Sequence, residues 1–332
     1  MAWGFPDSAG PGLGAAQERE LVDMAREATA EGSKTFFLAT RFMGQAEAEA
    51  VWSVYFWCRD LDEVADGAGF SSPKDRATEL ERRKALLARA FSSTGDVRPE
   101  GKVWKDDSGL ASALSLGLAA QRFRLEVEPF QDMIDGMLMD VQAEAKGQQV
   151  LYATADELDV YCYRVAGTVG LMTLPVVAQG LDTKDPELRA RAKALGEAFQ
   201  LTNILRDVGE DLRLRGRVYL PQETLDRFGV SVDDLQRMAK GETPLSDNYK
   251  SLLRHEIQRN LERYTVGESG IPMLPWTMRF PVRVALELYR EILVSIEEKS
   301  GLDNLSKRAF VGTLEKISLL PGILLRALFA VR

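Results

Sequence analysis

Residues 200–211 carry the sequence QLTNILRDVGED, and the spacing of its polar residues indicates a helix with one polar face. These polar residues are Gln200, Asn203, Asp207 and Asp211. Steps of three, four and four place them on one stripe of an α-helix. The positions between them are mostly apolar, so the stripe is not the outer side of a merely charged helix. We therefore predict a helix whose polar stripe is set in apolar surroundings.

Helical periodicity continues along the chain on both sides of this stretch. Apolar residues recur at three- and four-residue spacing, and no alternating β pattern interrupts them. The predicted helices cover residues 16–31, 45–66, 74–92, 108–146, 155–179, 186–213, 248–268, 277–299 and 308–331. Glycine and proline break the two connections, 93–107 and 214–247. We expect one all-α domain over residues 16–332, with residues 1–15 as a disordered leader or an expression remnant.

Composition excludes several classes of function. The 332 residues carry 42 basic and 50 acidic side chains, a net charge of −8, so nucleic acid is not an expected partner. One histidine and two cysteines without CxxC spacing argue against Ser-His-Asp chemistry, zinc sites and a disulfide framework. No stretch of eighteen apolar residues predicts a membrane span. The tail 319–329 is interpreted as a core helix, with contact to a membrane surface as the alternative.

A second acidic stretch, YFWCRDLDEVAD, covers residues 55–66. Asp62 and Asp66 are four residues apart and share one helix face, with Arg59 one turn earlier. Carboxylates crowded at a helix C-terminus repel one another, and a divalent cation would reverse that cost. A solvated helix end remains the alternative interpretation of this stretch.

Taken together, the two acidic stretches point to one kind of chemistry. Carboxylate and amide oxygens are hard ligands suited to Mg²⁺, and arginines bind phosphate oxygens with forked donors. Metal and arginine would take up a leaving diphosphate, while apolar walls would shelter a carbocation. The pattern therefore predicts a diphosphate ionisation site.

At these residues the chain resembles the squalene and phytoene synthase family, and within it most of all the phytoene-forming branch. The matching runs are SKTFF (33–37), YFWCRDLDEVADG (55–67), FQDMIDGM (130–137), YCYRVAGTVG (161–170), NILRDVGED (203–211), GRVYLP (216–221) and KRAFV (307–311). The resemblance spans about residue 20 to the C-terminus. It implies a helical bundle with a central active-site cavity.

The resemblance also implies roles for single residues. Mg²⁺, or Mn²⁺ in its place, would be bound by Asp62, Glu63, Asp66, Asn203, Asp207 and Asp211, whose four aspartates form the catalytic set. Substrate contacts would come from Ser33, Lys34, Thr35, Tyr55, Arg59, Gln200, Arg206, Arg217, Tyr289 and Arg308. Gly167 and Gly170 either permit close helix packing or lengthen a prenyl channel.

The activity implied is a head-to-head condensation of two geranylgeranyl diphosphates to phytoene, the first step of carotenoid biosynthesis, without NADPH. Squalene or dehydrosqualene synthesis from farnesyl diphosphate is the nearest alternative, and a non-catalytic scaffold relative is a third. The resemblance further implies carotenoid-pathway enzymes as partners. It implies a plastid stroma or membrane-surface location, with a bacterial cytoplasm as the alternative.

Overall fold

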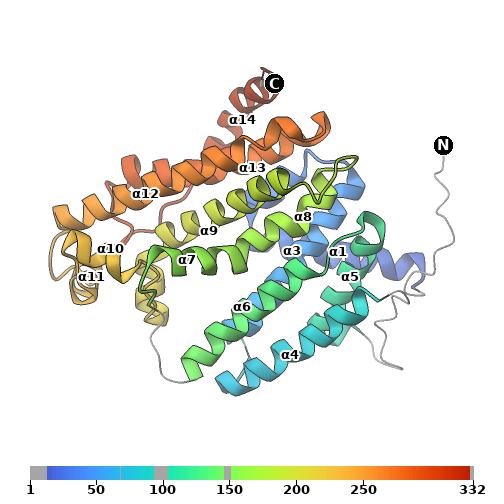
Figure 1. Ribbon diagram of the computed structural model, residues 1–332, viewed down its shortest axis with the longest axis horizontal. Helices are drawn as coiled ribbons and strands as arrows, with labels where there is room; N and C mark the ends of the chain where they lie inside the picture. The colour runs from blue at the N-terminus through green and yellow to red at the C-terminus, as the bar shows by residue number, and fades with distance from the viewer. Residues whose placement is uncertain (1–12, 68, 93–103, 146–150, 330–332) are drawn as a thin grey trace. The chain divides into compact units, whose positions relative to one another are not determined.

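The computed structural model describes residues 13–67, 69–92, 104–145 and 151–329 (Figure 1). Secondary structure within these ranges is helical and contains no strand, which confirms the all-α prediction. Residues 1–12 of the predicted leader and 93–103 of the first connection lie outside them. The chain forms two compact units, Met1–Gln142 with Pro175–Val177 and Ala143–Leu174 with Ala178–Arg332.

The first unit is built around helix α3 (Gln45–Ala65). This helix packs against α1 (Ala15–Gly32), α4 (Pro73–Ala90) and α5 (Ser108–Phe123). The short α2 (Lys34–Thr40) follows α1, and α6 (Glu128–Ala145) follows α5. Val54, Trp57 and Leu61 of α3 are fully buried. Helix α3 is apolar on most faces because three neighbours cover it.

Two local features of this unit differ from what the apolar periodicity predicts. The helix predicted over 108–146 is two helices, because Arg124 takes a left-handed conformation (φ 53°, ψ 50°) that ends α5. Apolar spacing continues across the break, so the pattern does not reveal it. Helix α2 has only seven residues, too few for a periodic pattern.

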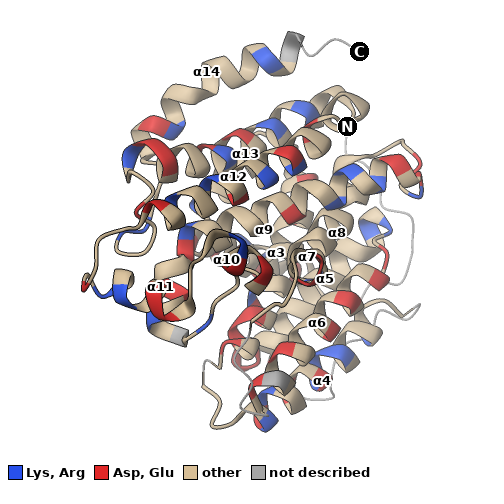
Figure 2. Cartoon of the chain, turned by 60° about the vertical axis from the view of Figure 1, so that its left-hand side comes forward, with Lys and Arg blue, Asp and Glu red and all other residues tan. Residues whose placement is uncertain are grey.

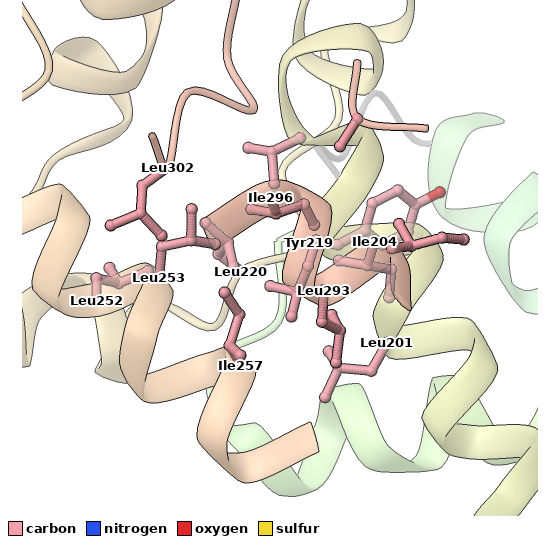
Figure 3. Packing of buried hydrophobic residues seen from close by; sticks show 14 of the residues in the cluster. Leu201, Ile204, Tyr219, Leu220, Leu252, Leu253, Ile257, Leu293, Ile296 and Leu302 are labelled. Carbon is pink, nitrogen blue, oxygen red and sulfur yellow. The ribbon is translucent and has the colours of Figure 1, made fainter. Parts of the chain in front are cut away.

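The second unit is organised along α9 (Pro186–Arg215), which packs against α12 (Asp247–Glu268) and α13 (Trp276–Val294). The other elements are α7 (Ala155–Cys162), the π-helix η2 (Tyr163–Gly167), α8 (Thr168–Val177), α10 (Gln222–Phe228), α11 (Val232–Ala239), η3 (Ile271–Met273), η4 (Ser295–Lys299) and α14 (Thr313–Phe329). Figure 3 shows the core, in which Leu201 and Ile204 of α9 lie among apolar side chains that include Leu253 and Ile257 of α12. Helices α10 and α11 fall within the segment 214–247 that was predicted as a connection.

Glycines bring two backbones of this unit into contact. A Cβ at Gly170 of α8 would overlap the carbonyl oxygen of Ala192 on α9, and a Cβ at Gly196 of α9 would overlap that of Ala166. Gly170 therefore permits close helix packing, which supports the first of the two interpretations of the glycines in this run. The channel interpretation stays a prediction.

Two apolar segments bear on contact with lipid. The stretch Ala155–Val177 is long and apolar enough to cross a membrane, with mean hydropathy 1.3, but half of it is buried within the fold. A core helix of a soluble protein meets the same criteria, so this is weak evidence for a span. Within the tail 319–329, Ile323 and Ala327 are buried, whereas Leu324 and Leu325 are 43% and 56% exposed. This segment therefore packs one face against the fold and leaves the other exposed, so it is not fully a core helix.

Candidate active site

Three carboxylates at the C-terminal end of α3 are predicted metal ligands. Asp62, Glu63 and Asp66 are exposed, and Asp62 and Asp66 share one helix face. The Arg59 Nε atom donates to Glu63 Oε1 at 3.0 Å, so one predicted phosphate donor is paired with one predicted metal ligand. Asp66 is the C-cap residue, and its N–H donates to the Asp62 carbonyl oxygen at 2.8 Å.

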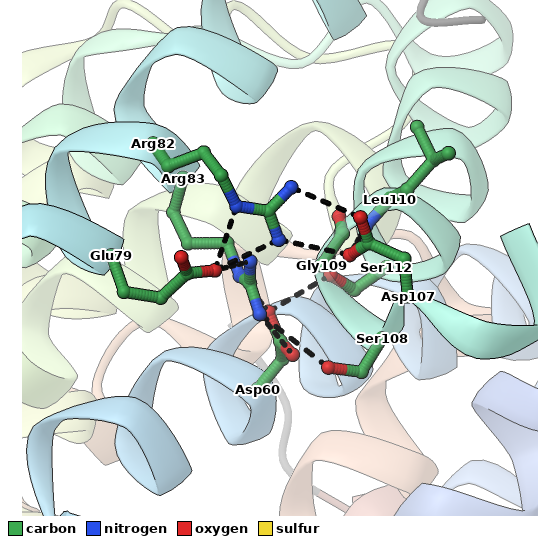
Figure 4. A network of polar contacts seen from close by, with 9 residues as sticks. All are labelled: Asp60, Glu79, Arg82, Arg83, Asp107, Ser108, Gly109, Leu110 and Ser112. Atoms are coloured by element: carbon green, nitrogen blue, oxygen red, sulfur yellow. Dashed lines mark hydrogen bonds and ion pairs between the residues drawn. The ribbon is translucent and has the colours of Figure 1, made fainter. Parts of the chain in front are cut away.

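Asp60, two residues before Asp62, has a different role. Its side chain is buried, and Arg83 Nε of α4 donates to its Oδ2 atom at 2.6 Å (Figure 4). Arg83 Nη2 reaches Oδ1 at 3.2 Å, and Ser112 Oγ of α5 donates to Oδ2 at 3.2 Å. These contacts tie α3 to both neighbours. Asp60 is therefore a structural group within the acidic motif.

The segment with the predicted substrate contacts Ser33, Lys34 and Thr35 lies beside Tyr55 of α3. Ser33 ends α1 and caps α2, where its Oγ atom accepts from the N–H of Phe36 at 3.3 Å. The Phe36 ring stacks on Tyr55 with 5.7 Å between ring centroids. A Cβ at Gly32 would overlap the Tyr55 hydroxyl, so that glycine makes room for it. The fold thus brings Tyr55 close to the Ser33 segment, in which Lys34 is exposed and Thr35 is half-buried.

On α9 the polar stripe has the predicted setting. Its members are all half-buried, namely Gln200, Asn203, Asp207 and Asp211. Leu201, Ile204 and Leu205 on the adjoining faces are buried. The stripe is therefore polar within apolar surroundings, neither solvated like a surface helix nor enclosed like a core.

Two arginines converge on Asp207. Arg206 Nε donates to Asp207 Oδ1 at 2.8 Å, and Arg308 Nε donates to the same oxygen at 2.7 Å. Burial alone would raise the pKa of Asp207, but the hydrogen bonds from Arg206 and Arg308 outweigh it and hold the pKa below its usual range. Asp207 is consequently ionised, and the guanidinium groups of Arg206 and Arg308 lie within hydrogen-bond distance of it.

The remaining predicted contacts of this unit lie on its neighbouring elements. Tyr289 of α13 stacks on Phe199 of α9 with 4.4 Å between centroids, one residue before Gln200. The Arg217 guanidinium lies 3.4 Å from the Tyr219 hydroxyl and 3.5 Å from Glu144. Phe199 and Tyr289 thus place an aromatic surface next to the stripe.

The donor set can be tested against a divalent cation. Among the residues that the structure describes, no group of three or more His, Cys, Asp or Glu side chains forms a ready metal cage. Mg²⁺ retains several waters and uses one or two carboxylates together with substrate phosphates. The i,i+4 carboxylate pair on α3 and the one on α9 are each made of the hard ligands that this mode of binding uses.

Other findings were not expected from the sequence. Glu210 Oε2 lies 3.2 Å from Arg308 Nε, although no spacing rule singled Glu210 out. A pocket of about 510 Å³ in the first unit is lined by residues that include Phe37, Thr40 and Trp52 and by none of the predicted site residues. The predicted central cavity stays a prediction.

Comparison with known proteins now defines the class. The family model for squalene/phytoene synthase matches residues 29–315, and the chain belongs to this family. It is 38% identical over 325 residues to the 15-cis-phytoene synthase of Synechococcus elongatus, covering 96% of each chain. It is 40% identical over 313 residues to the chloroplastic phytoene synthase of Daucus carota, covering 94% of this chain and 72% of that protein.

Solved structures agree on the fold. A dehydrosqualene synthase in complex with ligand superposes with a TM-score of 0.75 at 28% identity, covering 93% of this chain and 96% of that one. A squalene synthase from Alicyclobacillus acidocaldarius superposes with a TM-score of 0.69 at 22% identity, covering 87% and 97%. The second likeness concerns the fold alone.

Proposed function

We propose that this chain is a 15-cis-phytoene synthase. It condenses two geranylgeranyl diphosphates head to head, first to a cyclopropylcarbinyl diphosphate and then to phytoene. Each stage releases one diphosphate and ends with loss of one proton, so no hydride donor is needed. The observation that carries the proposal is 38–40% identity along nearly the whole chain to enzymes of that name.

The diphosphate-binding part of the proposal rests on α9. Arg206 and Arg308 present forked guanidinium groups at Asp207, and such forks match phosphate oxygens in geometry and charge. We assign both to the substrate diphosphate, with Gln200, Arg217 and Tyr289 around them. Ser33, Lys34, Thr35, Tyr55 and Arg59 of the first unit are assigned to substrate in the same way.

Metal binding is part of this proposal. Asp62, Glu63, Asp66, Asn203, Asp207 and Asp211 would hold Mg²⁺, with Mn²⁺ as a substitute. The ion supplies Lewis-acid stabilisation of the departing diphosphate. Apolar residues beside the stripe, such as Leu201 and Ile204, exclude water from one flank of the site.

Farnesyl diphosphate is the competing substrate. The structural similarity to a dehydrosqualene synthase supports it at 28% identity, against 38–40% for the phytoene synthases. A non-catalytic scaffold relative is disfavoured, because a scaffold needs neither paired carboxylates nor arginines set against them.

The experiment is a product assay with purified protein, Mg²⁺ and one prenyl diphosphate at a time. We expect phytoene from geranylgeranyl diphosphate in the absence of NADPH, resolved by chromatography. Dehydrosqualene or squalene from farnesyl diphosphate, formed at a higher kcat/KM than phytoene, would overturn the substrate assignment. Arg308→Ala protein serves as the matched negative control. No product from either substrate would favour the scaffold.

We also propose peripheral contact with a membrane through α14. Phe310, Leu314, Ile317 and Leu325 are exposed, and charge on α14 is confined to its ends (Figure 2). Phytoene has no polar group, so it must pass from the enzyme into a lipid phase. Contact at such a surface would also bring carotenoid-pathway enzymes within reach. The proposed location is the plastid stroma or membrane surface, with a bacterial cytoplasm as the alternative.

Vesicle sedimentation tests the membrane contact. The wild-type chain should sediment with phospholipid vesicles, and Leu314→Glu with Leu325→Glu should release it. Val266→Glu on α12, at another exposed apolar residue, is the control. Equal sedimentation of all three proteins would remove α14 from the proposal.

A further inference from the structure

Arg308 lies in the segment that connects η4 to α14. Residues 303–311 of this segment form neither helix nor strand. Arg308 nevertheless reaches Asp207 at 2.7 Å and Glu210 at 3.2 Å, while half of its side chain stays exposed. A side chain on an irregular segment keeps such a position only if the backbone beneath it is held. The contacts that hold this backbone converge on α9 between Leu205 and Arg213.

Asn304 makes the central attachment. Its Nδ2 atom donates to the Leu205 carbonyl oxygen at 2.6 Å, and its own carbonyl oxygen accepts from the Gly209 N–H at 3.2 Å. Leu205 O and Gly209 N are four residues apart, the spacing of acceptor and donor in an α-helix. Asn304 therefore engages both ends of one turn of α9, and it is 2% exposed.

Tyr249 fixes the orientation of that carboxamide. Its hydroxyl donates to Asn304 Oδ1 at 2.6 Å from the neighbouring helix α12. Tyr249 is fully buried, and burial raises the pKa of its hydroxyl, which therefore stays protonated as a donor. With Oδ1 bonded to Tyr249 and Nδ2 bonded to Leu205, the Asn304 side chain has one satisfied orientation.

Gly209 allows the segment to come this close. A Cβ at position 209 would overlap the Leu305 carbonyl oxygen, which also accepts a hydrogen bond from the Arg213 guanidinium. The glycine inside the acidic run 203–211 thus has a geometric role. It lets residues 304 and 305 lie directly on the backbone of α9.

We infer that Asn304, oriented by Tyr249, is a positioning residue that sets the Arg308 guanidinium against Asp207 for diphosphate binding. Arg308 follows Asn304 by only four positions, so a shift of the Asn304 backbone displaces Arg308. The inference rests on the proposed function, since it takes Arg308 as a diphosphate contact. It adds a polar pair that touches no substrate.

The test compares Asn304→Ala, Tyr249→Phe and Arg308→Ala with the wild-type chain. Inorganic diphosphate is titrated calorimetrically in the presence of Mg²⁺, and the KM for geranylgeranyl diphosphate is measured in parallel. Tyr264→Phe is the matched control, because Tyr264 is also a buried tyrosine of α12 and its hydroxyl bonds Thr202 at 2.8 Å. The double variant Asn304→Ala/Arg308→Ala completes a double-mutant cycle.

We expect Arg308→Ala to raise the Kd for diphosphate by roughly tenfold or more, as for loss of a charged hydrogen bond. Asn304→Ala should raise it by a similar factor, and Tyr249→Phe by less. The double variant should bind no more weakly than Arg308→Ala alone. Tyr264→Phe should lower the melting temperature as Tyr249→Phe does, yet keep the wild-type Kd. The inference would be overturned if the increases in Kd of the two single variants multiply in the double variant. A wild-type Kd in Asn304→Ala would overturn it as well.

Hydrogen exchange separates this inference from the proposed function. Amides 304–308 should exchange faster in Asn304→Ala and Tyr249→Phe than in Tyr264→Phe, whatever the substrate of the enzyme. Unchanged exchange in both variants would refute the attachment itself. Absence of phytoene synthesis by the wild-type chain would instead refute the proposed function.

Discussion

Two aspartates that are two residues apart on α3 should respond oppositely to the same substitution. Asp60→Asn removes the charge that faces Arg83, whose side chain is 4% exposed, whereas Asp62→Asn changes an exposed residue. We expect the first variant to lose stability and keep its turnover. The second should keep its stability and lose most turnover, because it gives up a proposed metal ligand.

The magnitude follows from the contacts of Asp60. Breaking a buried ion pair by removing one partner costs about 3–5 kcal/mol, because the remaining charge is left buried. Asparagine keeps one acceptor oxygen, and Glu79 also contacts Arg83, so the lower end of about 3 kcal/mol applies. With an unfolding entropy of about 2.1 cal/mol/K per residue, roughly 0.7 kcal/mol/K for 332 residues, the melting temperature should fall by about 4 °C. For Asp62→Asn a change within about 0.5 kcal/mol is expected, as for other surface substitutions.

The assay measures thermal unfolding by circular dichroism and turnover well below the melting transition, on the same preparations. Arg83→Met in an Asp60→Leu background replaces the pair with apolar side chains and should recover part of the lost stability. Wild-type melting of Asp60→Asn would refute the structural role of Asp60. Near-normal turnover of Asp62→Asn would remove the acidic end of α3 from the active site.

Three further outcomes are expected. Chelation of divalent metal should abolish turnover and leave the helical circular dichroism unchanged, since the carboxylates lie beside the packed core; full activity in chelator would contradict the metal assignment. Addition of NADPH should not change the rate or the product, because phytoene formation ends in proton loss; an NADPH-dependent product would point to squalene synthesis. Gly170→Ala should destabilise the chain by about 1–3 kcal/mol through overlap with the Ala192 carbonyl oxygen, whereas Gly312→Ala, with open space around it, should melt like the wild type.

Long helices could be predicted from the sequence, because each repeats its apolar spacing over several turns. The end of α5 was missed because Arg124 adopts the left-handed conformation that glycine usually takes at a helix end. Pro129, the second residue of α6, was the signal for a new helix start within the predicted helix 108–146. Helices α2, α10 and α11, with seven, seven and eight residues, are held by their neighbours and by caps such as Ser33 and Ser231.

The site divides in the same way. The spacing within one helix predicted that Asp62 and Asp66 share a face and that Asn203 and Asp207 share a face, because i,i+4 geometry is local. It did not reveal that Arg308, 101 positions further along the chain, forms an ion pair with Asp207. The same limit hid the burial of Asp60, whose partner Arg83 lies 23 positions further along. Contacts across long sequence separations leave no periodic signal.

The glycine contact between α8 and α9 has a mechanical consequence when it is combined with the Asn304 attachment. Helix α9 is clamped at Ala192–Gly196 by backbone contact and again at Leu205–Gly209 by hydrogen bonds. Leu205 follows Gly196 by nine positions, about 13.5 Å along the helix at 1.5 Å per residue. Gln200 and Asn203 lie in the helix segment between these two attachments. Because the backbone of this segment is already held, we expect the conformational entropy lost on ligand binding to come from the side chains.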